Sequence, residues 1–107
     1  MSEDASVHIA DILESIDKIR RYVGELSYVE FIEDDMLLDA VVRNLLIIGE
    51  AVRNLPDGVK RAYPDIEWGK IVGLRNILFH AYSRVDTEIV WSIITTKLGE
   101  LEEHLRA

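Results

Sequence analysis

The chain has 107 residues, enough for one domain, which we expect over residues 1–107, and too few for two. Its formal net charge is −8, so nucleic-acid binding would have to use a local basic patch against an unfavourable overall field. It contains no cysteine, which excludes disulfides, thiolate zinc sites and a cysteine nucleophile.

No apolar run approaches the roughly 20 residues that a membrane-spanning helix needs. The longest, Leu45–Ile48, lies between Arg43-Asn44 and Gly49-Glu50. The first residues, Met1-Ser2-Glu3-Asp4, are acidic, whereas a signal peptide begins basic and then runs apolar. The sequence therefore predicts a cytoplasmic protein with no membrane association.

Apolar periodicity predicts two long helices in the first half of the chain. The first runs from about Asp4 to Val23, and Gly24 can take the left-handed position at its end. Ser27-Tyr28-Val29-Glu30 is typical of a capping box before a short helical turn. The second helix should begin near Asp34 or Asp35 and end at Leu55. Since it is apolar nearly all round, we expect it at the centre of a bundle.

The second half of the chain predicts shorter elements. Residues from Asp57 to Tyr63 fit a short helical turn, and a helix opened by Asp65 or Ile66 should reach roughly His80. Asp86 is a suitable N-cap for the last helix. No segment alternates with period two for long. We therefore expect an all-α fold, an antiparallel bundle of about four main helices with short helical connectors.

Three polar residues share one side of the helix predicted to reach His80. On a continuous helix from Glu67 to Tyr82, with about 100° per residue, Arg75, Asn76 and His80 project away from the apolar face. Tyr82 returns close to Arg75 if the helical turn persists. This arrangement predicts a polar site directed away from the bundle.

Gly69 and Gly73 fall on the same stripe of that helix as His80. Each costs helix stability on the order of 1 kcal/mol relative to Ala, and together they remove bulk beside the polar residues. A second helix could approach closely there. The stripe therefore predicts a homodimer.

The polar residues suffice for metal-free cleavage of RNA. His80 can accept a proton near neutral pH, and Arg75 can hold a phosphate with paired donors. Asn76 can orient the imidazole. A base that removes the ribose 2′-hydroxyl proton, and an Arg that stabilises charge on the phosphate, would cleave RNA and spare DNA. The alternative at this spacing is a surface Arg and His that only form hydrogen bonds.

Arg75-Asn76-x3-His80-x-Tyr82 resembles the Arg-x4-His-x-Tyr signature of toxins of the HEPN superfamily, specifically the HepT type. Its flanks are similar too, and they are Ile47-Ile48-Gly49-Glu50-Ala51, Trp68-x2-Ile71-x-Gly73-Leu74 and Val85-Asp86-x3-Val90-Trp91. The sequence departs from the pattern at Leu74, where Met is expected, and at Leu98-Gly99, where Leu-Pro is expected. Neither departure touches the proposed chemistry.

The resemblance implies a HEPN-type bundle that is a homodimer, with the signature at or near the subunit interface. It implies a metal-independent endoribonuclease without a cofactor, in which Arg75 and His80 are catalytic and Asn76 is their polar companion. It also implies a partner of the type VII-like toxin–antitoxin kind, a minimal nucleotidyltransferase (MNT) antitoxin. That partner would neutralise the toxin by transferring AMP to the signature tyrosine, here Tyr82.

A second function stays open, a non-catalytic helical adaptor that binds a nucleotidyltransferase or a nucleotide, and the acidic charge favours it. Glu50 lies in the most apolar helix and should pair with an Arg or a backbone donor. His8 and His104 are expected at the surface, and Trp68 and Trp91 in the core or an interface. The remaining basic residues that could form an RNA-facing patch are Arg20, Arg21, Arg43, Arg53, Lys60, Arg61, Lys70 and Arg84.

Overall fold

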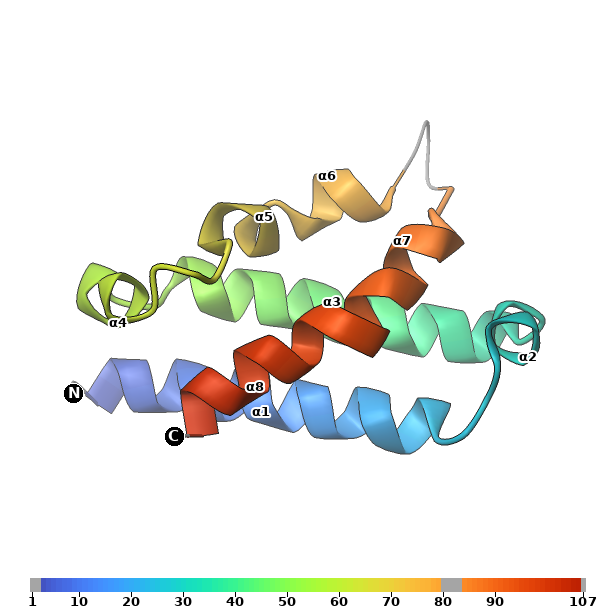
Figure 1. The fold of residues 1–107 in the computed structure, drawn as a ribbon, viewed down its shortest axis with the longest axis horizontal. Coiled ribbons are helices and arrows are strands. Elements are labelled where there is room, and N and C mark those ends of the chain that lie inside the picture. Colours follow the sequence, from blue (N-terminus) through green and yellow to red (C-terminus); the bar gives the residue numbers. More distant parts are fainter. Residues whose placement is uncertain (1–2, 80–83, 107) are drawn as a thin grey trace.

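The computed structural model describes residues 3–79 and 84–106, and over these ranges the chain forms an all-helical, antiparallel bundle, as predicted (Figure 1). The elements in chain order are α1 (Glu3–Val23), α2 (Tyr28–Ile32), α3 (Asp35–Arg53), α4 (Asp57–Ala62), α5 (Trp68–Val72), α6 (Leu74–Leu78), α7 (Thr87–Ser92), a π-helical turn η1 (Ile93–Lys97) and α8 (Leu98–Arg106). None of the helices in the described ranges is long and apolar enough to cross a membrane.

The antiparallel pair of α1 and α3 forms the centre of the bundle (Figure 1). The chain leaves α1 at Gly24, whose φ of 52° is the left-handed conformation that glycine adopts without strain. Ser27 then forms the predicted capping box with Glu30, whose carboxylate accepts a hydrogen bond from the Ser27 backbone N–H at 3.0 Å. Asp34 caps α3 by accepting a hydrogen bond from the Leu37 N–H at 3.0 Å. Local sequence signals thus fix both ends of the turn between the two helices.

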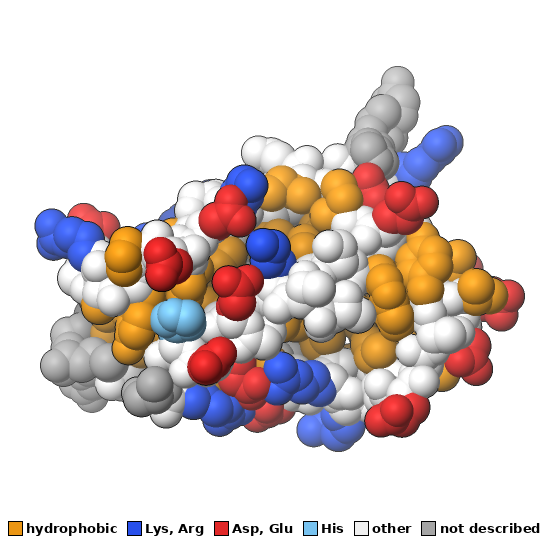
Figure 2. Space-filling view, in the orientation of Figure 1, with side chains coloured by type: hydrophobic (Ala, Val, Ile, Leu, Met, Phe, Trp, Pro, Cys, Tyr) orange, Lys and Arg blue, Asp and Glu red, His pale blue; other side chains and the backbone are white. Residues whose placement is uncertain are grey.

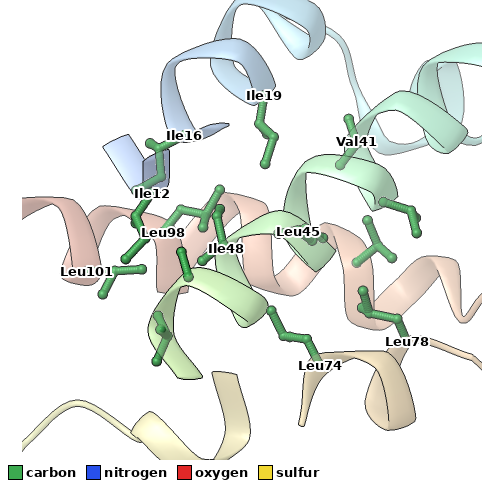
Figure 3. Close-up of a cluster of buried hydrophobic side chains, with 14 of the residues drawn as sticks. Ile12, Ile16, Ile19, Val41, Leu45, Ile48, Leu74, Leu78, Leu98 and Leu101 are labelled. Carbon is green, nitrogen blue, oxygen red and sulfur yellow. The ribbon is translucent and has the colours of Figure 1, made fainter. Parts of the chain in front are cut away.

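The core is built from apolar side chains of four elements that meet around α3 (Figure 3). These side chains come from α1 (Ile12, Ile16, Ile19), α3 (Val41, Leu45, Ile48), α6 (Leu74, Leu78) and α8 (Leu98, Leu101). All are buried. The central position predicted for α3 is therefore confirmed.

The predicted single helix between residue 65 and His80 is wrong, because it is divided into α5 and α6. The two meet at Gly73, whose N–H still donates to the Gly69 carbonyl at 3.0 Å. Helix α6 then ends at Leu78, and Phe79 is extended (φ −106°, ψ 131°). The continuous wheel from Glu67 to Tyr82 therefore does not hold.

Tertiary contacts account for both interruptions. At Gly49 the backbone of α5 approaches α3 so closely that an added Cβ would lie 2.9 Å from the Ile71 carbonyl oxygen. After α6, the Asp86 N–H donates to the Leu78 carbonyl at 2.7 Å, and Phe79 pairs with Val85 in an isolated antiparallel bridge. These bonds draw the chain away from a helical path.

The glycine stripe predicted beside His80 is interrupted by the junction between α5 and α6, and His80 itself lies outside the described residues. An added Cβ at Gly69 would meet no atom within 4 Å, whereas one at Gly73 would lie 3.3 Å from the Gly69 carbonyl oxygen. The Gly73 position therefore serves the junction between α5 and α6. The homodimer expected from the stripe stays a prediction.

The last helix follows its predicted start, and Asp86 accepts a hydrogen bond from the Ile89 N–H at 3.1 Å. Its middle forms the π-helical turn η1, which was not predicted. There the Thr95 hydroxyl donates to the Trp91 carbonyl at 2.7 Å, an interaction that competes with regular helical hydrogen bonding. Beyond the turn, α8 packs across α1 (Figure 1).

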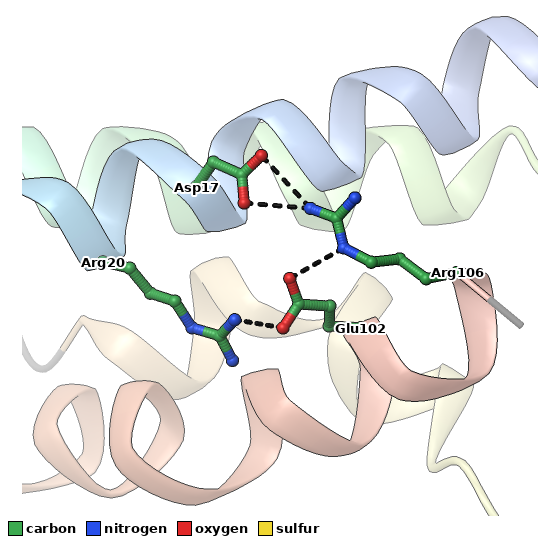
Figure 4. A network of polar contacts seen from close by, with 4 residues as sticks. All are labelled: Asp17, Arg20, Glu102 and Arg106. Atoms are coloured by element: carbon green, nitrogen blue, oxygen red, sulfur yellow. Dashed lines mark hydrogen bonds and ion pairs between the residues drawn. The ribbon is translucent and has the colours of Figure 1, made fainter.

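A charged network fastens α8 to α1 (Figure 4). Arg106 donates to both carboxylate oxygens of Asp17, at 2.9 and 3.1 Å, and to Glu102 at 2.9 Å. Arg20 pairs with the other oxygen of Glu102. The hydrogen bond from Arg106, followed by that from Arg20, lowers the pKa of Glu102 below its ordinary value.

Candidate functional site

The polar segment singled out in the sequence begins within α6. Arg75 and Asn76 are both exposed on α6, whose buried side carries Leu74 and Leu78. Their projection away from the bundle is therefore confirmed. His80 and Tyr82 lie outside the described residues.

Arg75 contacts an aromatic ring and has no ion-pair partner among the described residues. Its guanidinium carbon lies 6.0 Å from the centre of the Phe79 ring, a cation–π distance that also limits where the side chain can go. Among the described residues, no carboxylate lies within ion-pair distance of Arg75. Its donors are consequently available to a phosphate, which a planar guanidinium can bind with two parallel hydrogen bonds.

Both ends of the segment are held together. Phe79 and Val85 form the antiparallel bridge, and the Asp86 N–H donates to the Leu78 carbonyl. Asp86 also caps α7. The connection that carries the signature residues is thus anchored to a helix on each side.

A shallow depression of about 690 Å³ adjoins the bridge. Phe79 and Val85 line one side of it, and α3 supplies the remaining lining, which is Asp39, Val42, Arg43, Leu46, Ile47 and Glu50. Its apolar floor is therefore bordered by charges of both signs. This surface joins α3 to the signature segment.

Glu50 does not follow its predicted environment. It is exposed at the edge of the depression, and among the described residues neither an Arg nor a backbone donor pairs with it. The prediction of a paired carboxylate is therefore wrong. The reason is that one face of α3 remains uncovered, although the sequence of this helix is apolar nearly all round.

Two of the candidate basic residues form ion pairs with nearby carboxylates, and two others lie near the signature segment. Arg20 is bound to Glu102, and Lys70 pairs with Glu67 at 2.7 Å. By contrast, Arg43 lines the same depression as Phe79, and Arg84 is exposed next to the bridge residue Val85. Together with Arg75, these two Arg residues form the basic group nearest the signature segment.

A second hollow, of about 400 Å³, opens between α5–α6 and α7–α8. Figure 2 shows hydrophobic side chains inside this face of the molecule, with Lys and Glu side chains around them. Glu67 bridges its mouth by pairing with Lys70 and, at 3.6 Å, with Lys97. The hollow is lined mainly by isoleucine and leucine, so it offers little acid–base chemistry.

The other singled-out residues have structural surroundings. The Trp68 indole N–H donates to the Lys60 carbonyl at 2.9 Å, and Trp91 packs against Phe31 with ring centres 5.3 Å apart, so both tryptophans anchor the fold. His104 is half-buried, with its ring edge-on to Tyr63. His8 is half-buried on α1 as well. The surface positions expected for the two histidines are thus only partly correct.

Sequence reasoning missed Phe79 and the α3 side of the site. Phe79 follows Arg75 by four residues, a spacing that brings side chains together on a helix and could have indicated the contact. No comparable signal connects Arg43 or Glu50 with Phe79. Their proximity comes from the packing of α6 and α3.

Comparisons with known proteins agree on one family. The family model described as "Ribonuclease HepT-like" matches residues 12–107. The chain is 34% identical over 102 residues to a Methanocaldococcus jannaschii protein provisionally named an RNase, an alignment that covers 95% of this chain and 94% of that protein. It is 35% identical over 95 residues to the probable ribonuclease HepT of Thermococcus cleftensis, covering 89% and 86% of the two chains. No solved structure matches significantly.

Proposed function

The chain belongs to the HepT-like ribonuclease family, and on that premise we propose that it is a metal-independent endoribonuclease, the toxin of a type VII-like pair with an MNT antitoxin. The observation that carries the proposal is Arg75. Its side chain is exposed, lies over Phe79 and is unpaired among the described residues. An anion-binding group is therefore available at the start of the segment that contains His80.

The proposed reaction needs only groups of the chain and the RNA. His80 accepts the 2′-hydroxyl proton, and the 2′-oxygen forms a bond to phosphorus while the bond to the 5′-oxygen breaks. The leaving 5′-oxygen takes a proton from solvent water, and protonated His80 returns its proton to the solvent, so the products are a 2′,3′-cyclic phosphate and a 5′-hydroxyl. Arg75 stabilises the charge that develops on the phosphate, and Asn76 supports the imidazole.

The test uses an RNA oligonucleotide and its all-deoxy counterpart with the purified chain. We expect cleavage of the RNA alone, because DNA lacks the attacking hydroxyl. Arg75→Ala should lower the rate by about 100-fold or more, the scale of losing one transition-state donor. Lys18→Ala is the control and should leave the rate unchanged, because Lys18 pairs with Glu14 on α1 and is not among the candidate RNA-facing residues. Equal cleavage of DNA would refute the mechanism.

Tyr82 is the proposed point of control. AMP attached to its hydroxyl would place a phosphodiester two residues from His80, where it could compete with RNA for Arg75. Tyr82→Phe should then retain RNase activity yet resist neutralisation when it is co-expressed with the cognate nucleotidyltransferase. If wild-type toxicity is suppressed while peptide mass spectrometry finds no AMP on Tyr82, neutralisation works by binding alone.

The alternative is a non-catalytic adaptor for a nucleotidyltransferase, favoured by the formal charge of −8. An adaptor would bind the nucleotidyltransferase but cleave no RNA at any concentration. Expression of the ribonuclease should arrest growth, and this arrest should disappear with His80→Ala. We further propose that the active form is a homodimer.

A further inference from the structure

The hollow between α5–α6 and α7–α8 is too large to be an ordinary packing defect. Its volume of about 400 Å³ is more than ten times the roughly 30 Å³ that one water molecule occupies in the liquid. Folded interiors contain few voids larger than a water molecule, whereas small-molecule sites span about 300–1,000 Å³. The hollow, which we call the hollow behind α6, therefore has the size of a ligand site.

The uncharged lining of this hollow is entirely isoleucine and leucine. Five of these side chains are buried, and they are Ile48, Ile66, Leu74, Leu98 and Leu101. The other four are half-buried isoleucines, and they are Ile71, Ile77, Ile89 and Ile93. Part of each of these four side chains is uncovered, so a hydrocarbon group that entered the hollow would remove apolar surface from water.

The π-helical turn η1 contributes to this lining. Ile93 and Lys97 are its first and last residues, and both line the hollow. The Leu98 N–H donates to the Ile93 carbonyl, which is the five-residue spacing of a π-helix. Such turns interrupt regular α-helical bonding and occur frequently at functional sites. The irregular part of the last helix thus coincides with the hollow.

Charged side chains are exposed around the hollow, and acids outnumber bases among them (Figure 2). The charged residues of the lining are Asp65, Glu67, Lys70, Lys97 and Glu100. Three carboxylates and two ammonium groups give this rim a formal charge of −1. An acidic rim favours a ligand that carries a positive charge.

Both ammonium groups of the rim already have carboxylate partners. Lys70 lies 2.7 Å from Glu67, and Lys97 lies 3.6 Å from Glu67 and 3.9 Å from Glu100. The hydrogen bond from Lys70, followed by its charge, lowers the pKa of Glu67, so this carboxylate is ionised at neutral pH. Asp65, by contrast, pairs with no Lys or Arg in the part of the chain that the structure describes. A cation could therefore pair with Asp65, whereas an anion would have to displace an existing partner.

We propose that the hollow behind α6 is a binding site for an amphiphilic cation, a molecule with a hydrocarbon body and one protonated amine. The body covers the isoleucine surface, and the amine lies at the rim beside Asp65. This site is separate from the proposed ribonuclease chemistry, although the two share a helix. Leu74 and Ile77 line the hollow from α6, and Arg75 is exposed on the same helix. The ligand consequently contacts the helix that carries Arg75.

The experiment uses three eight-carbon probes that differ in the head group, n-octylammonium, 1-octanol and octanoate. Each is titrated at neutral pH into the full-length chain with labelled isoleucine methyl groups, and NMR follows their chemical shifts. We expect saturable shifts of Ile71, Ile77, Ile89 and Ile93, and none of Ile32 on α2. The n-octylammonium ion should bind about 3- to 5-fold more tightly than 1-octanol, the scale of one exposed ion pair, and octanoate should bind more weakly than 1-octanol.

Three variants test the two parts of the site. Asp65→Asn should lower the affinity for n-octylammonium to about that for 1-octanol, and leave binding of 1-octanol unchanged. Asp57→Asn, exposed on α4 and outside the lining, is the matched control and should bind all probes like wild type. Ile93→Trp adds bulk inside the hollow and should weaken every probe by about tenfold, the scale of overpacking. Circular dichroism verifies folding.

Each contrary outcome refutes a stated part of the inference. Equal binding of n-octylammonium and 1-octanol, or tighter binding of octanoate, would overturn the cationic ligand. Absence of saturable binding, or binding that folded Ile93→Trp leaves unchanged, would overturn the site. Binding is measured without RNA, so a chain that binds the cation but cleaves no RNA would refute only the ribonuclease. Cleavage of RNA without probe binding would refute only this site.

Discussion

Gly49→Ala tests how closely α5 must approach α3. The new Cβ would lie 2.9 Å from the Ile71 carbonyl oxygen and 3.8 Å from the Leu74 Cβ. The first contact involves backbone, so it cannot be relieved by turning a side chain. Helix α5 would have to move away from α3 by about half an ångström to restore ordinary contact.

Two opposing effects determine the magnitude. Alanine in a helix interior is favoured over glycine by about 1 kcal/mol. Overpacking against backbone costs about 1 to 3 kcal/mol, and lost contacts between α5 and α3 add to it. We expect the free energy of unfolding to fall by about 1 to 2 kcal/mol and the Tm by roughly 4 to 10 °C.

Urea denaturation followed by circular dichroism measures the change, and Gly69→Ala is the matched control. An added Cβ at Gly69 meets no atom within 4 Å, so this substitution should stabilise the protein by up to about 1 kcal/mol. Gly49→Ala should also lower RNase activity under conditions where the variant is folded, because α5 leads directly into α6 and Arg75. If Gly49→Ala is as stable as wild type, the close approach of the two helices is wrong.

Two further predictions concern side-chain contacts. Phe79→Leu removes the ring beneath Arg75 and should lower kcat/KM for RNA about 2- to 5-fold, the scale of an exposed cation–π contact; an unchanged value would show that the contact does not position Arg75. Glu102→Gln should destabilise the protein by up to about 1 kcal/mol at pH 7, since the Arg side chains of its ion pairs are about half exposed to solvent. The folded-state pKa of Glu102 lies below its unfolded value, so its contribution is present above the unfolded pKa and is lost as the pH falls through the folded pKa. The stability difference measured by urea denaturation should therefore vanish in acid, and a difference that grows in acid would contradict this assignment.

The features that sequence predicted correctly are governed by nearby residues. Ser27, Asp34 and Asp86 accept hydrogen bonds from backbone N–H groups three positions later, so their capping roles can be read from spacing. Gly24 likewise takes the left-handed conformation expected after α1. Arg75 was expected to be exposed because Leu74, Ile77 and Leu78 form the opposite, apolar face of the helix.

The features that sequence missed depend on residues distant in the chain. The division between α5 and α6 accompanies the close approach at Gly49, and the extended Phe79 follows from its bridge to Val85. Neither contact can be predicted from helical periodicity, because periodicity describes only residues within one helix. Glu50 was misjudged for a related reason, since composition could not reveal which face of α3 the other helices leave uncovered.

The central claim is that this chain cleaves RNA without metal by means of His80. Its most direct test is the cleavage rate of a single-stranded RNA by the purified wild-type chain in excess EDTA, beside the folded His80→Ala variant. The account predicts that wild type cleaves at the same rate with and without EDTA, leaving 2′,3′-cyclic phosphate ends, and that His80→Ala is inactive. Cleavage that EDTA abolishes, or that persists in His80→Ala, would contradict it.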